Sequence, residues 1–155
     1  ASDYPIFAHT AVGQHLQRLN VGALVGYFPP FSDFYYSFGV TRAFVEESQG
    51  VDVDFWRVDG EIGYFLNPRL SVKGYFLTRQ GNGLEFPDDF PAPRNDLHWY
   101  EHEGLLAREY VIVGVGADWS LNERVALTMS VITSVHEKFV HQIDHGITVG
   151  VVRRF

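Results

Sequence analysis

Three charged residues occupy every second position of one segment, and two more lie an even number of positions apart in the next segment. Alternate residues of a β-strand point to one face, so this spacing gathers the charges of each segment if both segments are strands. A tight turn at Asn67-Pro68-Arg69 would pair the two segments and bring Glu61 near Lys73, with Asp59 toward Arg79. The set consists of Arg57, Asp59, Glu61, Lys73 and Arg79.

This charge cluster admits three interpretations. In a small barrel, side chains fill the interior, and the cluster is then an internal salt-bridge network. In a wider pore, the same charges form a selectivity or gating constriction. The third interpretation, a carboxylate pair for acid–base catalysis, has no other support in the sequence.

A second candidate is the segment His98-Trp99-Tyr100-Glu101-His102, which matches the H-x-x-E-H pattern of inverted zinc peptidases. That chemistry needs a helix to place both histidines on one face, together with a third ligand downstream. The segment lies instead in a polar, proline-containing stretch. We therefore expect a polar and aromatic cluster there, with a surface metal site as the alternative.

Histidines also gather late in the chain, at His136, His141 and His145, and His9 and His15 are expected on the same side of the molecule. Clustered imidazoles can bind a metal or haem, or respond to pH. The spacing fits neither a helix nor a hairpin, so the sequence predicts solvated loop histidines and no bound cofactor.

The residue types of a lipid-modifying enzyme occur at Ser134, His136 and Glu137. No recognised lipase or acylase motif surrounds them. An enzyme that modifies lipid or lipopolysaccharide is therefore the alternative function and not the leading one.

The composition narrows the class of protein. The chain has 155 residues, no cysteine and a net charge of −7, which exclude disulfides and thiol chemistry and argue against nucleic-acid binding. Hydrophobic residues make up 46% of the chain, yet no run is long enough for a transmembrane helix. No signal peptide is visible, so we expect a mature or trimmed form.

Strand-like alternation of apolar and polar residues supplies the elements that would position these groups. Short turns are expected at 29–33, 67–69 and 120–123, and they alternate with longer connections at 47–52, 80–107 and 136–144. Aromatic residues lie beside the short turns, at Tyr27, Phe34, Tyr64 and Trp119. The alternating segments are 17–28, 34–46, 53–66, 70–79, 111–119, 125–131 and 147–155.

These features predict an all-β fold, an antiparallel transmembrane β-barrel of the bacterial outer membrane. Such barrels combine alternating strands, short periplasmic turns, longer outer loops and aromatic girdles at both interfaces. The alternative is a β-sandwich or lipocalin-like barrel with its apolar face inward.

The end of the chain, HGITVGVVRRF (145–155), resembles an outer-membrane assembly signal in its alternation, its glycines and its terminal Phe155. Arg153 departs from that pattern, which expects an apolar residue there. Residues 17–155 also resemble Gram-negative outer-membrane proteins of the phenol-degradation MetA type, often labelled as transporters. The resemblance implies a barrel fold and a transport role.

Strand direction raises a question of parity. If Phe155 is periplasmic, seven strands place the start of the first strand on the outer side, whereas single-chain bacterial barrels have even strand numbers. Residues 1–16, through Tyr4–Val12, would supply an eighth strand in a small barrel. Alternatively, the chain is the C-terminal part of a larger barrel.

The function expected from the sequence is therefore non-enzymatic: small-solute passage, or anchoring of a partner at the membrane. The expected partners are outer-membrane lipid and a protein bound through loop 80–107, whose Phe86, Phe90, Trp99 and Tyr100 suit a protein contact.

Overall fold

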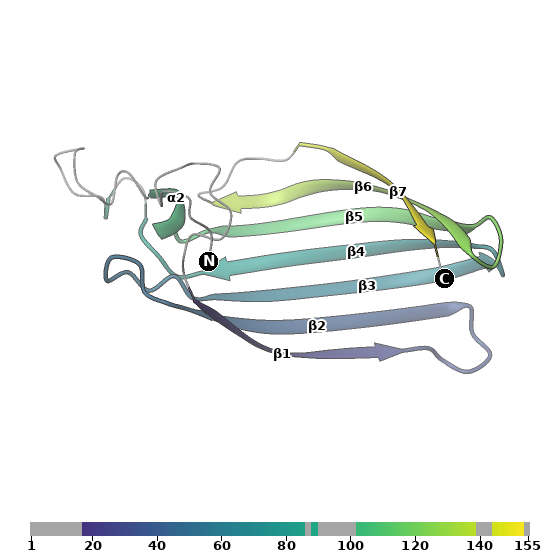
Figure 1. Ribbon diagram of the computed structural model, residues 1–155, viewed down its shortest axis with the longest axis horizontal. Coiled ribbons are helices and arrows are strands. Elements are labelled where there is room, and N and C mark those ends of the chain that lie inside the picture. The colour runs from purple at the N-terminus through teal and green to yellow at the C-terminus, as the bar shows by residue number, and fades with distance from the viewer. Residues whose placement is uncertain (1–16, 86–87, 90–101, 139–143, 154–155) are drawn as a thin grey trace.

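The strands form one antiparallel sheet in which every strand pairs with its neighbours in the sequence (Figure 1). The computed structural model describes residues 17–85, 88–89, 102–138 and 144–153. A short helix, α2 (His102–Leu105), precedes the fifth strand. All seven expected segments are confirmed as strands, with bounds that differ mainly at the ends. The strands are β1 (Arg18–Tyr27), β2 (Phe34–Val45), β3 (Phe55–Asn67), β4 (Leu70–Gly81), β5 (Glu109–Ser120), β6 (Val125–Lys138) and β7 (Gly146–Arg153).

The connections alternate in length, as predicted. The turns β1–β2, β3–β4 and β5–β6 are tight and lie together at the right of Figure 1, whereas the strand ends that lead into the longer connections lie at the left. Asparagine side chains close two of these turns. Asn67 Oδ1 accepts hydrogen bonds from the backbone N–H groups of Arg69 and Leu70, and Asn122 does the same for Arg124 and Val125.

The strand register aligns the apolar residues of all seven strands on one side of the sheet, here called the apolar face. Within the register, Tyr36 pairs with Ile62, Gly74 with Val115, and Met129 with Val149. A slip of one residue in any strand would move its apolar set to the other side. The exposed members of this face include Leu19, Val21, Val25, Phe38, Phe44, Trp56, Ile62, Val72, Phe76, Val115, Trp119, Met129, Val131, Ile147, Val149 and Val151.

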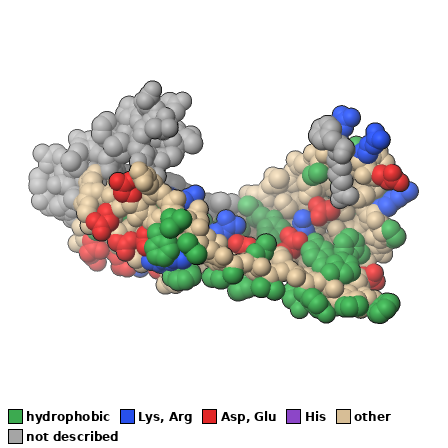
Figure 2. Space-filling model, turned by 60° about the horizontal axis from the view of Figure 1, so that its bottom comes forward, with side chains coloured by type: hydrophobic (Ala, Val, Ile, Leu, Met, Phe, Trp, Pro, Cys, Tyr) green, Lys and Arg blue, Asp and Glu red, His purple; other side chains and the backbone are tan. Residues whose placement is uncertain are grey.

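In the described part of the chain, this apolar face has no second layer over it. Val115 on β5 is 64% exposed and Ile62 on β3 is 57% exposed, although both strands lie inside the sheet. The buried hydrophobic residues are few, and Val53, Leu105 and Ala107 belong to the long connections. In Figure 2, hydrophobic side chains accordingly gather in a broad band along the lower surface.

The sheet is open within the described residues. β1 pairs only with β2, and β7 pairs only with β6, so each leaves a free edge. The barrel expected from the sequence is therefore not closed by these seven strands, and the eighth strand assigned to residues 1–16 lies outside the described residues. Both edge strands run from the left end of the sheet in Figure 1 toward the end that carries the short turns.

Glycines and aromatic rings interlock between neighbouring strands. A Cβ added at Gly63 would collide with the ring of Tyr35, and one at Gly114 would lie 2.5 Å from the ring of Tyr75. In both cases the ring covers the glycine of the next strand, an arrangement that stabilises strand glycines and fixes the register. Tyr35 also donates a hydrogen bond of 2.9 Å to Glu61 Oε1, which holds its ring in place.

We therefore expect Gly63→Ala to destabilise the folded chain by about 1–3 kcal/mol, because the new methyl group must displace the Tyr35 ring and its hydrogen bond. Gly74→Ala is the matched control, since its added Cβ would find the nearest atom at 3.9 Å. Thermal unfolding midpoints would show the difference. Equal midpoints for the two variants would contradict this packing.

Candidate functional site

The five charged residues predicted from the sequence share one side of the sheet, opposite the apolar face, and this side is here called the polar face. The register places Arg57 opposite Arg79, Glu61 opposite Tyr75, and Lys73 opposite Gly63. The shared face is therefore confirmed. The pairing of the individual charges agrees with the prediction only in part.

Lys73 is the centre of a polar network that crosses this face. Its Nζ atom lies 2.8 Å from Asp118 Oδ2 and 4.0 Å from Glu61 Oε2. The contact with Asp118 is the stronger one, since 4.0 Å is too long for a hydrogen bond. Glu61 in turn accepts the Tyr35 hydroxyl, and Asp118 accepts a hydrogen bond from Thr128. The network thereby links β2, β3, β4, β5 and β6.

Asp118 also lies on this face, but it is not part of the charge cluster predicted from the sequence. The signal was present, because Asp118 alternates with Gly114 and Gly116 along β5. Only the pairing of β4 with β5, which sets Gly116 opposite Lys73, brings Asp118 within reach. That pairing spans the long connection 82–108, which short-range turn signals do not predict.

The predicted approach of Asp59 to Arg79 is wrong. Asp59 lies opposite Leu77 and accepts a 3.1 Å hydrogen bond from Arg57 Nε. Arg79 turns away toward the long connections, where its guanidinium stacks 3.8 Å from the Phe55 ring centre and bonds to Tyr110. Two arginines directly opposite each other repel, which accounts for their divergence.

Arg42 interrupts the apolar face, and the structure shows how its charge is accommodated. Its Nη2 atom donates a 3.0 Å hydrogen bond to Asp54 Oδ2. The guanidinium also lies over the rings of Phe44 and Trp56, at 5.6 and 5.4 Å from their centres. The strand register places Arg42 in one row across the sheet with polar residues of β4, β5 and β6, namely Gln80, Glu109 and Lys138.

Aromatic side chains cluster at the opposite end of the sheet, beside the short turns. Phe34 and Tyr64 pack with ring centres 4.6 Å apart, and Tyr27 and Tyr36 with centres 5.6 Å apart. The sequence prediction of aromatic residues beside these turns is confirmed. The apolar face therefore ends in an aromatic row on one side and a charged row on the other.

The histidine candidates do not assemble into a site in the described residues. His136 and His145 are exposed, and His98 and His141 lie outside the described residues. His102 begins α2, but nothing is described of its side chain. Within the described ranges, no group of three or more His, Asp or Glu side chains is placed to hold a metal ion.

The Ser134, His136 and Glu137 combination lies on β6 beside an irregularity in the β5–β6 pairing, where Val111 faces His136 and Ile112 faces Ser134. No hydrogen bond joins the Ser134 hydroxyl to the exposed His136 ring in the described part of the chain. A nucleophile and its base must lie within hydrogen-bond reach to react. This segment therefore gives the enzymatic alternative no geometric support.

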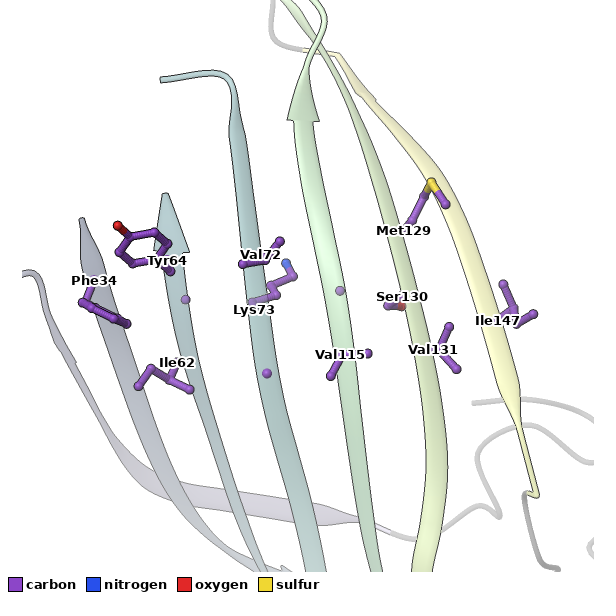
Figure 3. A pocket seen from close by; sticks show the side chains of 13 residues that line it. Phe34, Ile62, Tyr64, Val72, Lys73, Val115, Met129, Ser130, Val131 and Ile147 are labelled. Atoms are coloured by element: carbon purple, nitrogen blue, oxygen red, sulfur yellow. The ribbon is translucent and has the colours of Figure 1, made fainter. Parts of the chain in front are cut away.

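Each face of the sheet carries a hollow. The larger, about 610 Å³, lies on the apolar face over Gly74, and Figure 3 shows side chains from six neighbouring strands around it. The smaller, about 440 Å³, lies on the polar face over Gly22 and Gly39, and includes Arg57 and Asp59. The smaller hollow is lined by charged residues of both signs, Arg57 and Asp59, whereas Lys73 is the one charged residue that lines the larger hollow.

Comparison with known protein families, with characterised proteins and with solved structures finds no match for this chain. The resemblance to the MetA-type outer-membrane proteins therefore stays a prediction. In the parts of the chain that the structure describes, no helix has the length and apolarity needed to cross a membrane.

We expect Lys73→Met to destabilise the folded chain by about 1–3 kcal/mol, because it leaves the carboxylates of Glu61 and Asp118 without their shared cation. Arg57→Met is the control, since the Arg57–Asp59 pair is more exposed, at 50% and 37%, against 20% for Lys73. Exposed pairs contribute about 0–1 kcal/mol. Urea unfolding should separate the two variants, and an equal loss would show that the network adds no stability.

A second prediction concerns the β2–β3 connection. The backbone N–H of Asp54 and the side-chain amide of Asn82 both donate to the Asp52 carboxylate, at 2.9 and 2.7 Å, and they lower its pKa. A lowered pKa in the folded state means that Asp52 adds stability at neutral pH, which is lost as the pH falls through that folded pKa. Asn82→Ala should raise the pKa of Asp52, measured by NMR titration of its carboxyl carbon. An unchanged titration would show that this hydrogen bond does not form in solution.

Proposed function

We propose that this chain forms part or all of the wall of an outer-membrane β-barrel, with the apolar face toward lipid and the polar face toward an aqueous interior that passes small solutes. The observation that carries the proposal is the uncovered apolar face, which runs across all seven strands. Monomeric soluble proteins rarely leave so large a contiguous apolar area exposed.

The height of the apolar face supports this assignment. On β5, the apolar positions run from Val111 to Trp119, which is about 27 Å along the strand at the usual rise. A strand tilt of roughly 40° reduces this to about 21 Å, close to the apolar band of about 25 Å in outer-membrane barrels. The charged row at Arg42 and the aromatic row at Phe34 and Tyr64 bound this band, as interfacial residues do.

The connections support the same orientation. The short turns correspond to the periplasmic side of such barrels, and the long connections to the outer side. Because β1 and β7 run in the same direction, direct closure of the seven strands would pair them in parallel. An antiparallel barrel needs one further strand, or another odd number, between these edges. This requirement fits both a small barrel and a part of a larger one.

Passage of small solutes, in preference to simple anchoring, is supported by the polar face. Its charged side chains are partly exposed, and the hollow over Gly22 and Gly39 lies among them. A wall that served only as an anchor would have no need of exposed charges on the side away from lipid.

The proposal is tested by the depth of tryptophans in vesicles whose lipids carry bromine on the acyl chains. In a background with the three tryptophans changed to Phe, a tryptophan is placed at Val115, restored at Trp119, or placed at Tyr75. We expect mid-chain bromine to quench Val115→Trp most, Trp119 less, and the polar-face Tyr75→Trp least, because bromine quenches only tryptophans that it contacts.

Two outcomes would contradict parts of the proposal. Equal quenching at Val115→Trp and Tyr75→Trp would reject the assignment of the two faces. Swelling of the same vesicles in isotonic sugar or amino-acid solutions tests passage separately. Correct quenching without swelling would leave the membrane wall in place and reject passage.

A further inference from the structure

The smaller hollow, on the polar face, is lined by several hydrogen-bond donors that can hold a solute. It lies over β1, β2 and β3, with Gly22 and Gly39 in its floor and a volume of about 440 Å³. The register places Gly22 opposite Thr41 and Gly39 opposite Asp59, and each polar side chain lies close over its glycine: an added Cβ would meet Thr41 Oγ1 at 2.8 Å and Asp59 Oδ2 at 3.0 Å.

Arg57 is the principal charged group of this hollow. Its Nε atom donates to Asp59 Oδ1 at 3.1 Å, and half of its side chain is exposed. This single bond orients the guanidinium and leaves its terminal nitrogens without a partner among the described residues. Two parallel N–H groups of a guanidinium match the geometry of a carboxylate.

The surroundings of Arg57 favour an anion. Arg79 lies directly opposite it on β4, and Arg18 and Arg108 are close enough to Arg79 to interact with it electrostatically. The Arg79 guanidinium itself turns toward Phe55, so these cations add positive potential at this end of the polar face without lining the hollow. Asp59 is the one acidic side chain that lines the hollow, and its hydrogen bond with Arg57 offsets its charge.

The other groups of the hollow define the rest of the ligand. The Asn20 amide and the Thr41 hydroxyl both line it and can donate hydrogen bonds to a second oxygen. Leu24, also on its lining and 74% exposed, offers a small apolar contact. These groups suit a compact molecule with one carboxylate and a short apolar body.

We propose that this hollow is a binding site for small organic carboxylates, held by the guanidinium of Arg57 with Thr41 and Asn20. The inference rests on the proposed passage of small solutes and adds a substrate class to it. Asp59 is the positioning residue, because it holds Arg57 through Nε and leaves the two terminal nitrogens toward the ligand.

The test is direct binding of butyrate to the folded chain, with butyramide as the uncharged probe of the same shape. Saturation-transfer NMR at constant ionic strength would measure both. We expect saturable binding of butyrate and at least tenfold weaker binding of butyramide, since hydrogen bonds to a charged group are the stronger ones. Butyramide bound as tightly as butyrate would overturn the proposal, and so would an absence of saturable butyrate binding at millimolar concentrations.

Substitutions of Arg57 and of a control arginine then test whether butyrate binds in this hollow. Arg57→Gln should weaken butyrate binding about tenfold or more, and Arg57→Lys should restore it only in part, because lysine keeps the charge without the paired donors. Arg69→Gln is the control, since it removes the same charge from the exposed β3–β4 turn. Equal losses in Arg57→Gln and Arg69→Gln would indicate a general charge effect and overturn the site.

Two further measurements distinguish a failure of the carboxylate site from a failure of the proposed membrane wall. Thr41→Val removes a hydroxyl from the hollow with little change in shape, and it remains informative if Arg57→Gln fails to fold. We expect it to weaken butyrate binding several-fold. Unchanged binding would overturn the assignment of Thr41 and the hollow. The tryptophan quenching at Val115→Trp reports on membrane insertion alone. Insertion without butyrate binding rejects the carboxylate site only, whereas binding without insertion rejects the membrane wall and leaves the site standing.

Discussion

The uncovered apolar face is the constraint on which the rest of this structure depends. Fully burying a large hydrophobic side chain contributes about 1.5–3 kcal/mol, and the single-layered sheet exposes such side chains on every strand. In water, a sheet of this kind would associate through this face. Lipid acyl chains would cover it over its whole area without requiring any complementary shape, and that is the physical reason for preferring a membrane to a second protein layer.

The polar face follows from the same constraint. If one side of each strand faces lipid, the charged side chains must lie on the other side, and each must find a partner or water. Lys73 satisfies this requirement by bridging Asp118 and approaching Glu61, while Tyr35 contributes its hydroxyl to Glu61 and its ring to Gly63. One tyrosine thereby serves both the packing between strands and the hydrogen bonding of the charges.

The sequence predicted the strands and the two faces well because both depend on a period of two residues, which is a local signal. The short turns were equally predictable, since Asn67 and Asn122 carry the chemistry of a turn in their own side chains. Contacts that depend on the pairing of strands were not. Asp59 was assigned to Arg79, but it bonds to Arg57 two residues away, and Asp118 reached Lys73 through a pairing across the long connection 82–108.

The direction of the edge strands β1 and β7 limits how the sheet can close. An up-and-down sheet with an odd number of strands has edges that run the same way, so β1 and β7 cannot close on each other in the antiparallel manner of the strands between them. Two copies related by rotation about the barrel axis would meet in the same parallel fashion, because that rotation preserves strand direction. Antiparallel closure therefore demands an odd number of additional strands, and that number sets the diameter of the interior. With one added strand, side chains would fill the interior, and the polar face would be a packed network. With several, the hollow beside Arg57 would face open water and be reached by solutes.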